Sequence, residues 1–353
     1  MKVLVTGGCG YIGSVLVPEL LQKGYAVRIF DKLYFGKEHL EKADYGSRIE
    51  FVQGDVRNSE KNIFDSIGAV IHLGGLSNDP TAEFNTKANM EINHNGTKIL
   101  AEACIEKGIS KFLYASTASI YDKGLRADGD YILDEKSNVE PLAAYSQSKY
   151  AGERALLELM EKNNDFCPVI LRKGTLYGQS PRMRYDLVIN SMVRSAFMTG
   201  RIKVFCGGLQ WRPLVDIRDV ARAYITCLEA NISDVKGEIF NVCYDNFQIM
   251  DLAHRVKEAL KEIQQAEVDV DYTEGRIDRS YRISNEKLEE RLKFRYKVPV
   301  EDSTRIMGRN IKEFLSRGGK LSEFDKPIYF NIRWMEHLVE MEKRIKEMGC
   351  NVF

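Results

Sequence analysis

Short apolar runs alternate with longer amphipathic stretches through the first half of the chain. The apolar runs have the length of buried strands and are KVLVTG, YAVRIFD, RIEFVQGD, AVIHLGG, KFLYAS and CPVILRKG. Apolar residues at helical spacing fill the intervals at about 11–24 and 86–107, and the stretch that ends near 163. Strands that alternate with helices in this way predict an α/β fold, a parallel sheet with helices on both faces.

The rhythm changes after Gly174, where shorter, more polar and arginine-rich segments follow. The stretch WRPLVDIRDVARAYITCL pairs a short strand with an amphipathic helix, which indicates a return to the first domain. We therefore predict a sheet domain made of residues 1–172 plus about 212–245. The remaining residues, about 173–211 and 246–353, are expected to form a smaller C-terminal α/β lobe that binds the substrate and ends in a helical tail.

The composition is that of a globular chain without a bulk charge. Acidic and basic residues balance at 51 each among 353, and 44% of the residues are hydrophobic. A neutral balance gives no attraction for nucleic acid or for an anionic membrane, so neither is an expected partner. No apolar run has the length of a membrane span, and the first strand-like run begins at Lys2, which leaves no room for a signal peptide.

The cysteines and histidines are scattered along the chain. None of the seven cysteines forms a CxxC pair, which is typical of reduced thiols, and we expect a cytoplasmic protein. The five histidines show no metal-binding spacing, so no metal site is predicted.

A glycine-rich turn, TGGCGYIG, lies between the first predicted strand and the first predicted helix. It can be read as Gly8-x-Gly10-x-x-Gly13 or with Gly7 as its first glycine. Either reading places glycines where the backbone must turn tightly and approach a pyrophosphate at a helix N-terminus. A glycine pattern alone is weak evidence, but this one follows a strand and opens a helix, so it indicates a dinucleotide cofactor.

Two acidic residues stand where the adenosine half of a dinucleotide would lie. Asp31 ends the second predicted strand, where a carboxylate can accept hydrogen bonds from ribose hydroxyls and would repel a 2′-phosphate. NAD is therefore favoured over NADP, although the neighbouring Lys32 counts against that preference. Asp55, followed by Val56, is placed to meet the adenine; the alternative is that Asp55 caps a helix.

Tyr145 and Lys149, in the stretch YSQSKYAGE, stand one helical turn apart and so share one face of a helix. A phenol beside a fixed ammonium ionises more easily, because the positive charge favours phenolate and lowers the pKa. Such a pair can act as a general base that takes a proton from an alcohol while a hydride leaves the same carbon. The spacing alone is weak evidence, since a surface helix can carry both side chains by chance.

The motifs that precede this pair strengthen it, because they occur together in a fixed order. They are TGGCGYIG, the acidic Asp31, GDV at Asp55, HLGG at 72–75 and the region of Thr117. With YxxxK, they resemble the extended short-chain dehydrogenase/reductase family, and most of all its nucleotide-sugar epimerase/dehydratase branch, typified by UDP-galactose 4-epimerase. The resemblance covers roughly residues 1–300 and is most specific in the N-terminal half.

This resemblance implies a Rossmann-like, doubly wound sheet domain, NAD as the cofactor and a nucleotide-diphosphate sugar as the substrate. It also implies a homodimer formed through the helices near Asn93 and Tyr145. In the family, a Ser or Thr hydroxyl next to the catalytic Tyr contacts the substrate oxygen, and register assigns that role to Thr117, with Ser116 and Ser119 as rivals. Lys149 would hold the nicotinamide ribose and lower the Tyr145 pKa. The residues expected to bind NAD are Gly7, Gly10, Tyr11, Ile12, Gly13, Asp31, Lys32, Asp55, Val56, Leu73, Gly74, Gly75, Asn93, Ala115, Ser116, Tyr145 and Lys149.

Arginines are the expected ligands of the substrate diphosphate, because the guanidinium fork matches phosphate oxygens. The resemblance assigns this role to Arg212 and a second one to Arg279, with Arg276 and Arg282 as rivals. In GQSPRMRYDLVIN, the residues Arg182, Arg184 and Asn190 line the pocket, or the two arginines are surface charges. Ser77 and Asn78 follow the fourth predicted strand, where the family contacts the sugar; the alternative is a helix cap.

The residues around Thr117 and the histidines bear on the reaction type. Sugar 4,6-dehydratases of this family carry Asp-Glu directly after the Thr, whereas Thr117 is followed by Ala118 and Ser119, which disfavours dehydration. No histidine occurs between His94 and His254, which argues against a 3,5-epimerase. We therefore predict an NAD-dependent epimerase acting most readily at C4, with a C4 dehydrogenase or ketoreductase as the alternative and a non-catalytic NAD-binding regulator as the least favoured.

Overall fold

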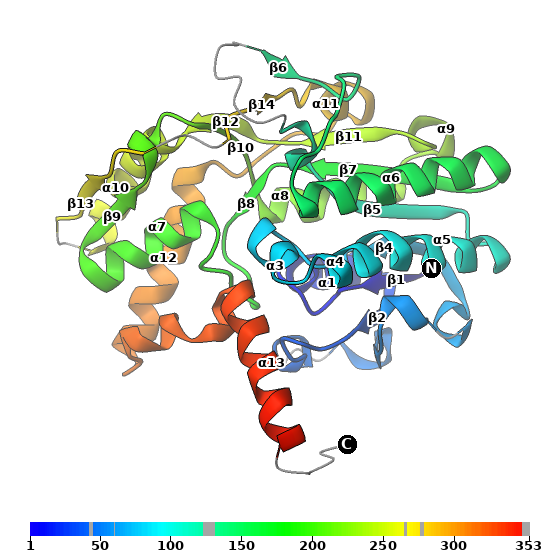
Figure 1. Ribbon diagram of the computed structural model, residues 1–353, viewed down its shortest axis with the longest axis horizontal. Coiled ribbons are helices and arrows are strands. Elements are labelled where there is room, and N and C mark those ends of the chain that lie inside the picture. Colours follow the sequence, from blue (N-terminus) through cyan, green and yellow to red (C-terminus); the bar gives the residue numbers. More distant parts are fainter. Residues whose placement is uncertain (42–44, 60, 123–130, 265–266, 276–278, 348–353) are drawn as a thin grey trace.

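The computed structural model describes residues 1–41, 45–59, 61–122, 131–264, 267–275 and 279–347. Its centre is a seven-stranded sheet with the order β11-β7-β5-β4-β1-β2-β3, in which every neighbouring pair is parallel (Figure 1). The strands are β1 (Lys2–Thr6), β2 (Ala26–Asp31), β3 (Ile49–Gln53), β4 (Ile67–His72), β5 (Lys111–Thr117), β7 (Cys167–Lys173) and β11 (Ile239–Val242). The strand order reverses between β1 and β4, so the predicted doubly wound, Rossmann-like sheet is confirmed.

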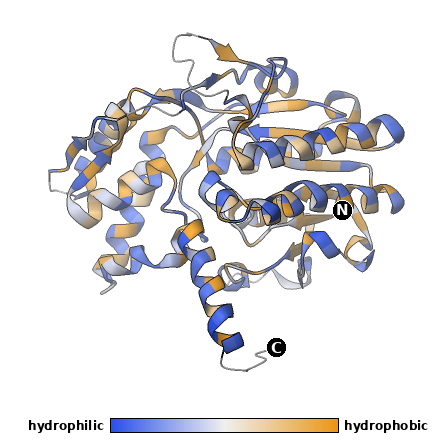
Figure 2. Ribbon diagram, in the orientation of Figure 1, coloured by the Kyte–Doolittle hydropathy of each residue, from blue (hydrophilic) through white to orange (hydrophobic). Residues whose placement is uncertain are grey.

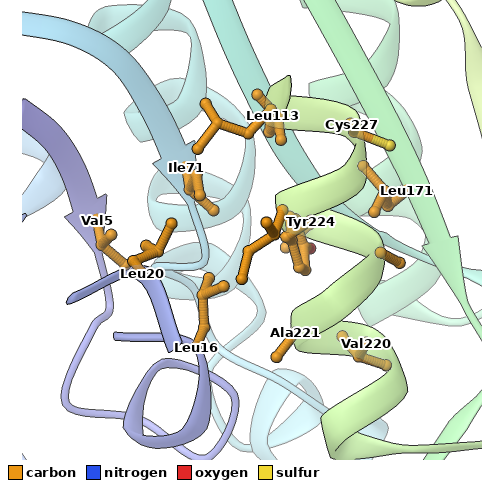
Figure 3. Close-up of a cluster of buried hydrophobic side chains, with 14 of the residues drawn as sticks. Val5, Leu16, Leu20, Ile71, Leu113, Leu171, Val220, Ala221, Tyr224 and Cys227 are labelled. Carbon is orange, nitrogen blue, oxygen red and sulfur yellow. The ribbon is translucent and has the colours of Figure 1, made fainter. Parts of the chain in front are cut away.

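Helices cover both faces of this sheet and bury its apolar side chains. On one face lie α1 (Gly13–Gln22) and α8 (Ile217–Glu229), whose Leu16 and Tyr224 pack with Ile71 of β4 in the core shown in Figure 3. On the other face, α5 (Thr97–Glu106) and α6 (Ala144–Lys162) bury apolar residues against the same strands. The helix predicted near 86–107 is α4 (Thr86–Met90) and α5 joined through a π-helical turn, Glu91–Gly96.

The stretch predicted to return to the sheet domain contributes to both parts of the molecule. Its strand, β10 (Trp211–Asp216), pairs with β8 (Thr175–Tyr177) and β12 (Asp245–Gln248) in a separate three-stranded sheet. Its helix, α8, packs against the large sheet instead. Within this stretch and the residues up to 245, α8 and β11 therefore belong with the large sheet, whereas β10 does not. The exact domain boundary stays a prediction.

The smaller lobe has an apolar core to which its helices and the three-stranded sheet contribute side chains. Figure 2 shows hydrophobic and hydrophilic residues alternating along these helices. Its main elements are α7 (Val188–Thr199), β9 (Arg201–Val204), α10 (Ile249–Gln264), β13 (Asp269–Tyr272) and α12 (Val300–Ser316). The short elements elsewhere are α2 (Glu38–Glu41), α3 (Asp79–Phe84), β6 (Ile132–Leu133), α9 (Ile232–Val235), β14 (Arg282–Ile283) and α11 (Glu286–Leu292). The last helix, α13 (Asn331–Glu347), leaves this lobe and runs past the edge of the large sheet (Figure 1). None of the helices in the described ranges combines the length and the apolar character that crossing a membrane requires.

Candidate active site

A cavity of about 500 Å³ opens at the carboxyl end of the parallel strands, where the strand order reverses. It reaches from the glycine-rich turn to the smaller lobe. Most of the predicted site residues line it, namely Gly7, Gly10, Tyr11, Ile12, Gly13, Asp31, Lys32, Asp55, Val56, Leu73, Gly74, Gly75, Ser77, Asn78, Ala115, Ser116, Thr117, Tyr145, Lys149, Arg182, Arg212 and Arg279. Arg276 lies outside the described residues.

The glycine-rich turn leaves no room for a Cβ at Gly7 or at Gly13. Gly7 has φ of +69°, and a Cβ there would stand 2.7 Å from the backbone nitrogen of Gly74. A Cβ on Gly13 would stand 2.3 Å from the carbonyl oxygen of Gly8. The turn therefore keeps bare backbone at the start of α1, which is the arrangement that lets a dinucleotide pyrophosphate approach. These residues fit NAD.

Asp31 is fixed at the end of β2 by backbone donors. Its Oδ1 accepts from the Leu33 nitrogen at 2.7 Å and its Oδ2 from the Cys9 nitrogen at 3.0 Å. Burial raises the pKa of this carboxyl group, and the two backbone hydrogen bonds oppose that rise. Each oxygen keeps a second lone pair, so the carboxylate can still accept from a ribose hydroxyl.

Asp55 caps the short helix that follows it, as the alternative prediction proposed. It accepts a hydrogen bond from the Arg57 backbone nitrogen at 3.0 Å, and the Arg57 side chain holds the pKa of the carboxyl group well below its usual range. The Lys32 ammonium also binds Asp55, at 2.7 Å. Lys32 is thus engaged by a carboxylate, which weakens its case as a ligand of a 2′-phosphate and supports NAD over NADP.

Tyr145 lies in the first turn of α6, facing Thr117 at the end of β5. Burial raises the pKa of the Tyr145 phenol to about 12. Asp79 adds to this rise, whereas Arg184 and a hydrogen bond with Thr117 oppose it. In the protein without cofactor, loss of water therefore outweighs the nearby positive charge, and the lowering of the Tyr145 pKa by Lys149 and the nicotinamide together stays a prediction.

Among the hydroxyls at the end of β5 and just after it, Thr117 is the one best placed beside the phenol, with which it shares a hydrogen bond. Ser116 donates to the Glu153 carboxylate, away from this position, while Ser119 Oγ lies 2.9 Å from Thr117 Oγ1. The assignment of Thr117 as the catalytic hydroxyl stays a prediction, with Ser119 as a partner that can pass on a proton.

Lys149 is almost fully buried one turn further along α6. Its Nζ lies 5.1 Å from the centre of the Tyr114 ring, and a Cβ on Gly75 would come within 3.0 Å of it. Burial lowers the pKa of Lys149 to about 8, and the charge of Glu153 opposes that shift. The ammonium is therefore held at the cavity wall by packing, and its pKa still lies above neutral pH.

The state of Lys149 predicts a pH dependence. We expect kcat/KM to fall as the pH rises through about 8, because the ammonium carries its charge below this pKa and loses it above. The measurement is a pH profile of kcat/KM for the sugar nucleotide at saturating NAD. A profile that stays flat through this range would contradict the role of the Lys149 charge.

Two predicted residues stand behind the cavity wall. Asn93 donates to Leu76 O at 2.9 Å and to Ser148 Oγ at 3.0 Å, and its Oδ1 accepts from the Leu76 nitrogen at 2.9 Å. Asn190 donates to Tyr11 Oη at 3.0 Å. Neither residue is among the residues that line the cavity. Instead of contacting cofactor or substrate, Asn93 positions the loop after β4 and Asn190 positions Tyr11.

The substrate arginines differ in how their charges are satisfied. Arg279 pairs with Asp79 at 2.6 Å and with Asp122 at 2.7 Å, so its charge is largely compensated. Arg212 donates to two backbone carbonyls, those of Arg279 at 2.6 Å and Trp211 at 2.9 Å. Of the two, Arg212 is therefore better suited to bind a diphosphate.

The pair Arg182 and Arg184 lies inside the cavity wall, which decides against surface charges. Arg184 binds Asp186 through both Nε and Nη2 at 2.9 Å, and Asn78 donates to the same carboxylate at 3.1 Å. Asn78 also caps α3 by accepting from the Thr81 nitrogen, so the cap and the cavity positions coincide. Ser77, Asn78 and the arginine loop thus form one polar wall.

Several cavity residues were missed by the sequence analysis. They include Asp79, Lys173, Tyr281, Asn331 and Met335. Asp79 follows two residues that were predicted, so the motif LSNDP held a signal for it. Asn331 and Met335 come from the C-terminal tail, where neither periodicity nor resemblance indicates a cavity.

Comparison with known proteins gives consistent matches. The model of the NAD dependent epimerase/dehydratase family matches residues 3–243. The dTDP-D-glucose 4,6-dehydratase of Mus musculus is 29% identical over 316 residues, which is 85% of this chain and 86% of that protein. A putative UDP-glucose 4-epimerase of Methanocaldococcus jannaschii is 31% identical over 249 residues, covering 68% of this chain and 76% of its own.

The fold also matches solved structures. UDP-glucuronic acid 4-epimerase from Bacillus cereus, in complex with UDP-glucuronic acid and NAD, aligns with a TM-score of 0.77 at 24% identity. The alignment covers 89% of this chain and 100% of that one. At this level of identity, the likeness concerns the fold.

Proposed function

Because the chain belongs to the NAD-dependent epimerase/dehydratase family, we propose that it is a nucleotide-sugar epimerase that oxidises the C4 carbinol transiently and then reduces it. The observation that carries the proposal is the group formed by Thr117, Tyr145 and Lys149 at the cavity wall. Directly after Thr117 come the buried Ala118 and then Ser119, so no carboxylate stands there to eliminate water.

In this proposal each residue has a separate task. NAD, when bound, would accept the hydride from C4 and return it to the keto sugar. Tyr145 Oη removes the proton from the C4 hydroxyl and later returns it to the keto oxygen, while Thr117 donates a hydrogen bond to that same oxygen. Lys149 keeps a positive charge next to the reacting groups, which favours the phenolate form of Tyr145. Turning the keto sugar between the two proton transfers inverts C4.

The charges of the cavity support the proposed substrate class. Arg212, with no carboxylate partner among the described ion pairs, offers a planar donor set to a diphosphate. The structural neighbour from Bacillus cereus holds UDP-glucuronic acid, which supports a nucleotide-diphosphate sugar as the ligand here. The base and the sugar are left to experiment.

The proposal predicts inversion of a sugar without net redox change. With a panel of nucleotide sugars and a trace of NAD, we expect NMR to show the C4 epimer while absorbance at 340 nm stays constant. Stoichiometric formation or consumption of NADH would instead identify a dehydrogenase or ketoreductase.

A second candidate, 4,6-dehydration, is favoured by Asp79. Its Oδ1 is buried at the cavity without a hydrogen-bond partner, and its charge acts on Tyr145. A carboxylate there can serve as the acid or base that elimination needs. In the same NMR experiment a 4-keto-6-deoxy product that disappears in Asp79→Asn would establish this reaction, and an unchanged C4 epimer in that variant would exclude it.

A further inference from the structure

The C-terminal tail contributes to the cavity through the first turn of α13. Asn331 is 6% exposed and, with Met335, lines the cavity. Its Nδ2 donates to Ser77 Oγ at 2.9 Å, and its Oδ1 accepts from Arg182 Nη2 at 2.6 Å. One turn later, Trp334 Nε1 donates to the Tyr34 carbonyl at 2.6 Å. These contacts fasten the start of α13 to the loops after β2, β4 and β8, while the rest of the helix points into solvent (Figure 1).

The guanidinium of Arg182 has a donor without a hydrogen-bond partner although the side chain is buried. Only 6% of the residue is exposed, and its guanidinium lies 3.6 Å from the centre of the Phe35 ring. The Nε of Arg182 is buried and has no hydrogen-bond partner. A charged donor without a partner is costly in a buried site, whereas a bound anion would satisfy both the donor and the charge.

The position of Arg182 indicates which anion would bind to it. Its loop is fastened to the glycine-rich turn, because Ser180 Oγ donates to Tyr11 O at 2.9 Å and Tyr11 Oη donates to Gly178 O at 2.6 Å. Tyr11 stands between the glycines at the start of α1, where a dinucleotide pyrophosphate binds. On its other side, Arg182 is close enough to Asp31 for their charges to interact.

We propose that Arg182 donates from Nε to a phosphate oxygen of the dinucleotide cofactor, and that Asn331 of the C-terminal tail holds the guanidinium in place for this contact. The proposal moves Arg182 from the predicted substrate ligands to the cofactor ligands. It gives the tail a role in cofactor binding, as a source of a positioning residue. It is independent of whether the chain epimerises or dehydrates its substrate.

Binding measurements on the cofactor-free protein test the proposal. We expect Arg182→Gln to weaken NAD about 10- to 100-fold, the range of a hydrogen bond to a charged group, and to leave the affinity for UDP unchanged. Arg333→Gln is the matched control, since Arg333 also stacks on a phenyl ring, Phe330 at 4.5 Å, but lies outside the cavity. A loss of UDP affinity with NAD affinity intact would overturn the proposal, as would an equal loss in Arg333→Gln.

Smaller ligands identify the group that Arg182 contacts. ADP carries the pyrophosphate and adenosine does not, so Arg182→Gln should weaken ADP and spare adenosine. Equal weakening of both would place Arg182 at the adenosine and overturn the phosphate contact. Arg182→Lys keeps a charge but loses Nε, so its NAD affinity is expected to lie between those of the native protein and Arg182→Gln. The contact can then still be tested if the Gln variant folds poorly.

The positioning role of Asn331 is tested by coupling to Arg182. Asn331→Ala should weaken NAD several-fold in the native background and have no further effect in Arg182→Gln, because both changes remove the same contact. Additive losses would show that Asn331 acts independently of Arg182 and would overturn the positioning role.

Discussion

Tyr145→Phe should lower turnover by about 10²- to 10⁴-fold, the range that a positioned general acid or base contributes. The phenyl ring fills the same space, so we expect NAD affinity and thermal stability to stay close to those of the native protein. The measurement is single-turnover kinetics together with NAD binding by calorimetry. Tyr150→Phe, on the same helix but outside the cavity, is the matched control and should keep full activity.

The Tyr145 phenol must be activated before it can act as a base. With a Tyr145 pKa of about 12, phenolate at neutral pH lies about 7 kcal/mol uphill at ~1.36 kcal/mol per unit. The ammonium of Lys149 and the positive charge of the cofactor must supply that stabilisation in the ternary complex. If Tyr145→Phe kept more than about a tenth of the native turnover, another group would be the base and Ser119 would be the first to test.

The fold was predictable because its signals are local. Apolar runs such as KVLVTG and AVIHLGG match buried parallel strands. The turn at Gly7–Gly13 has glycines where a Cβ would collide with the backbone, so its sequence indicates its conformation. The pairing of β10 was not predictable in this way. Its sequence is compatible with a place in the large sheet or in the three-stranded sheet. Pairing with β8 and β12, which lie far from it along the chain, decides for the three-stranded sheet.

The site was predictable where a residue type has one chemical reason to be present. Asp31, Tyr145 and Lys149 line the cavity as expected. The sequence could not show that carboxylates neutralise Arg279, because Asp79 lies 200 positions away. It also could not show that the tail returns to the cavity at Asn331, since a single polar residue at a helix start has no pattern that distinguishes it from a cap.

Behind the predicted catalytic residues lies a buried ion pair between Glu153 and Arg172. Arg172 Nε donates to Glu153 Oε1 at 3.0 Å and Nη2 to Oε2 at 2.6 Å, and both side chains are almost fully buried. Ser116 also donates to Glu153, and Arg172 Nη1 donates to Tyr121 Oη at 2.8 Å. The pair therefore fastens α6 to β5 and β7 next to the cavity.

Glu153→Gln should destabilise the protein by about 3–5 kcal/mol, because it leaves the Arg172 charge buried without its counter-ion. The readout is the shift in the urea and thermal unfolding midpoints relative to the native chain. Glu158→Gln, which removes an exposed carboxylate on the same helix from its contact with Arg154, is the matched control and should cost at most about 0.5 kcal/mol. Changing both partners, Glu153→Gln with Arg172→Met, should recover part of the loss, since no charge then remains buried alone.

The same variant has a second, independent readout at Lys149. The Glu153 carboxylate raises the pKa of Lys149 against the effect of burial, so its removal should lower that pKa further. In Glu153→Gln the fall of kcat/KM with rising pH should therefore begin at a lower pH than in the native protein. A destabilised variant with an unmoved pH profile would mean that the ion pair supports the fold without tuning Lys149. An unmoved unfolding midpoint would show that Arg172 finds another partner when Glu153 is neutral.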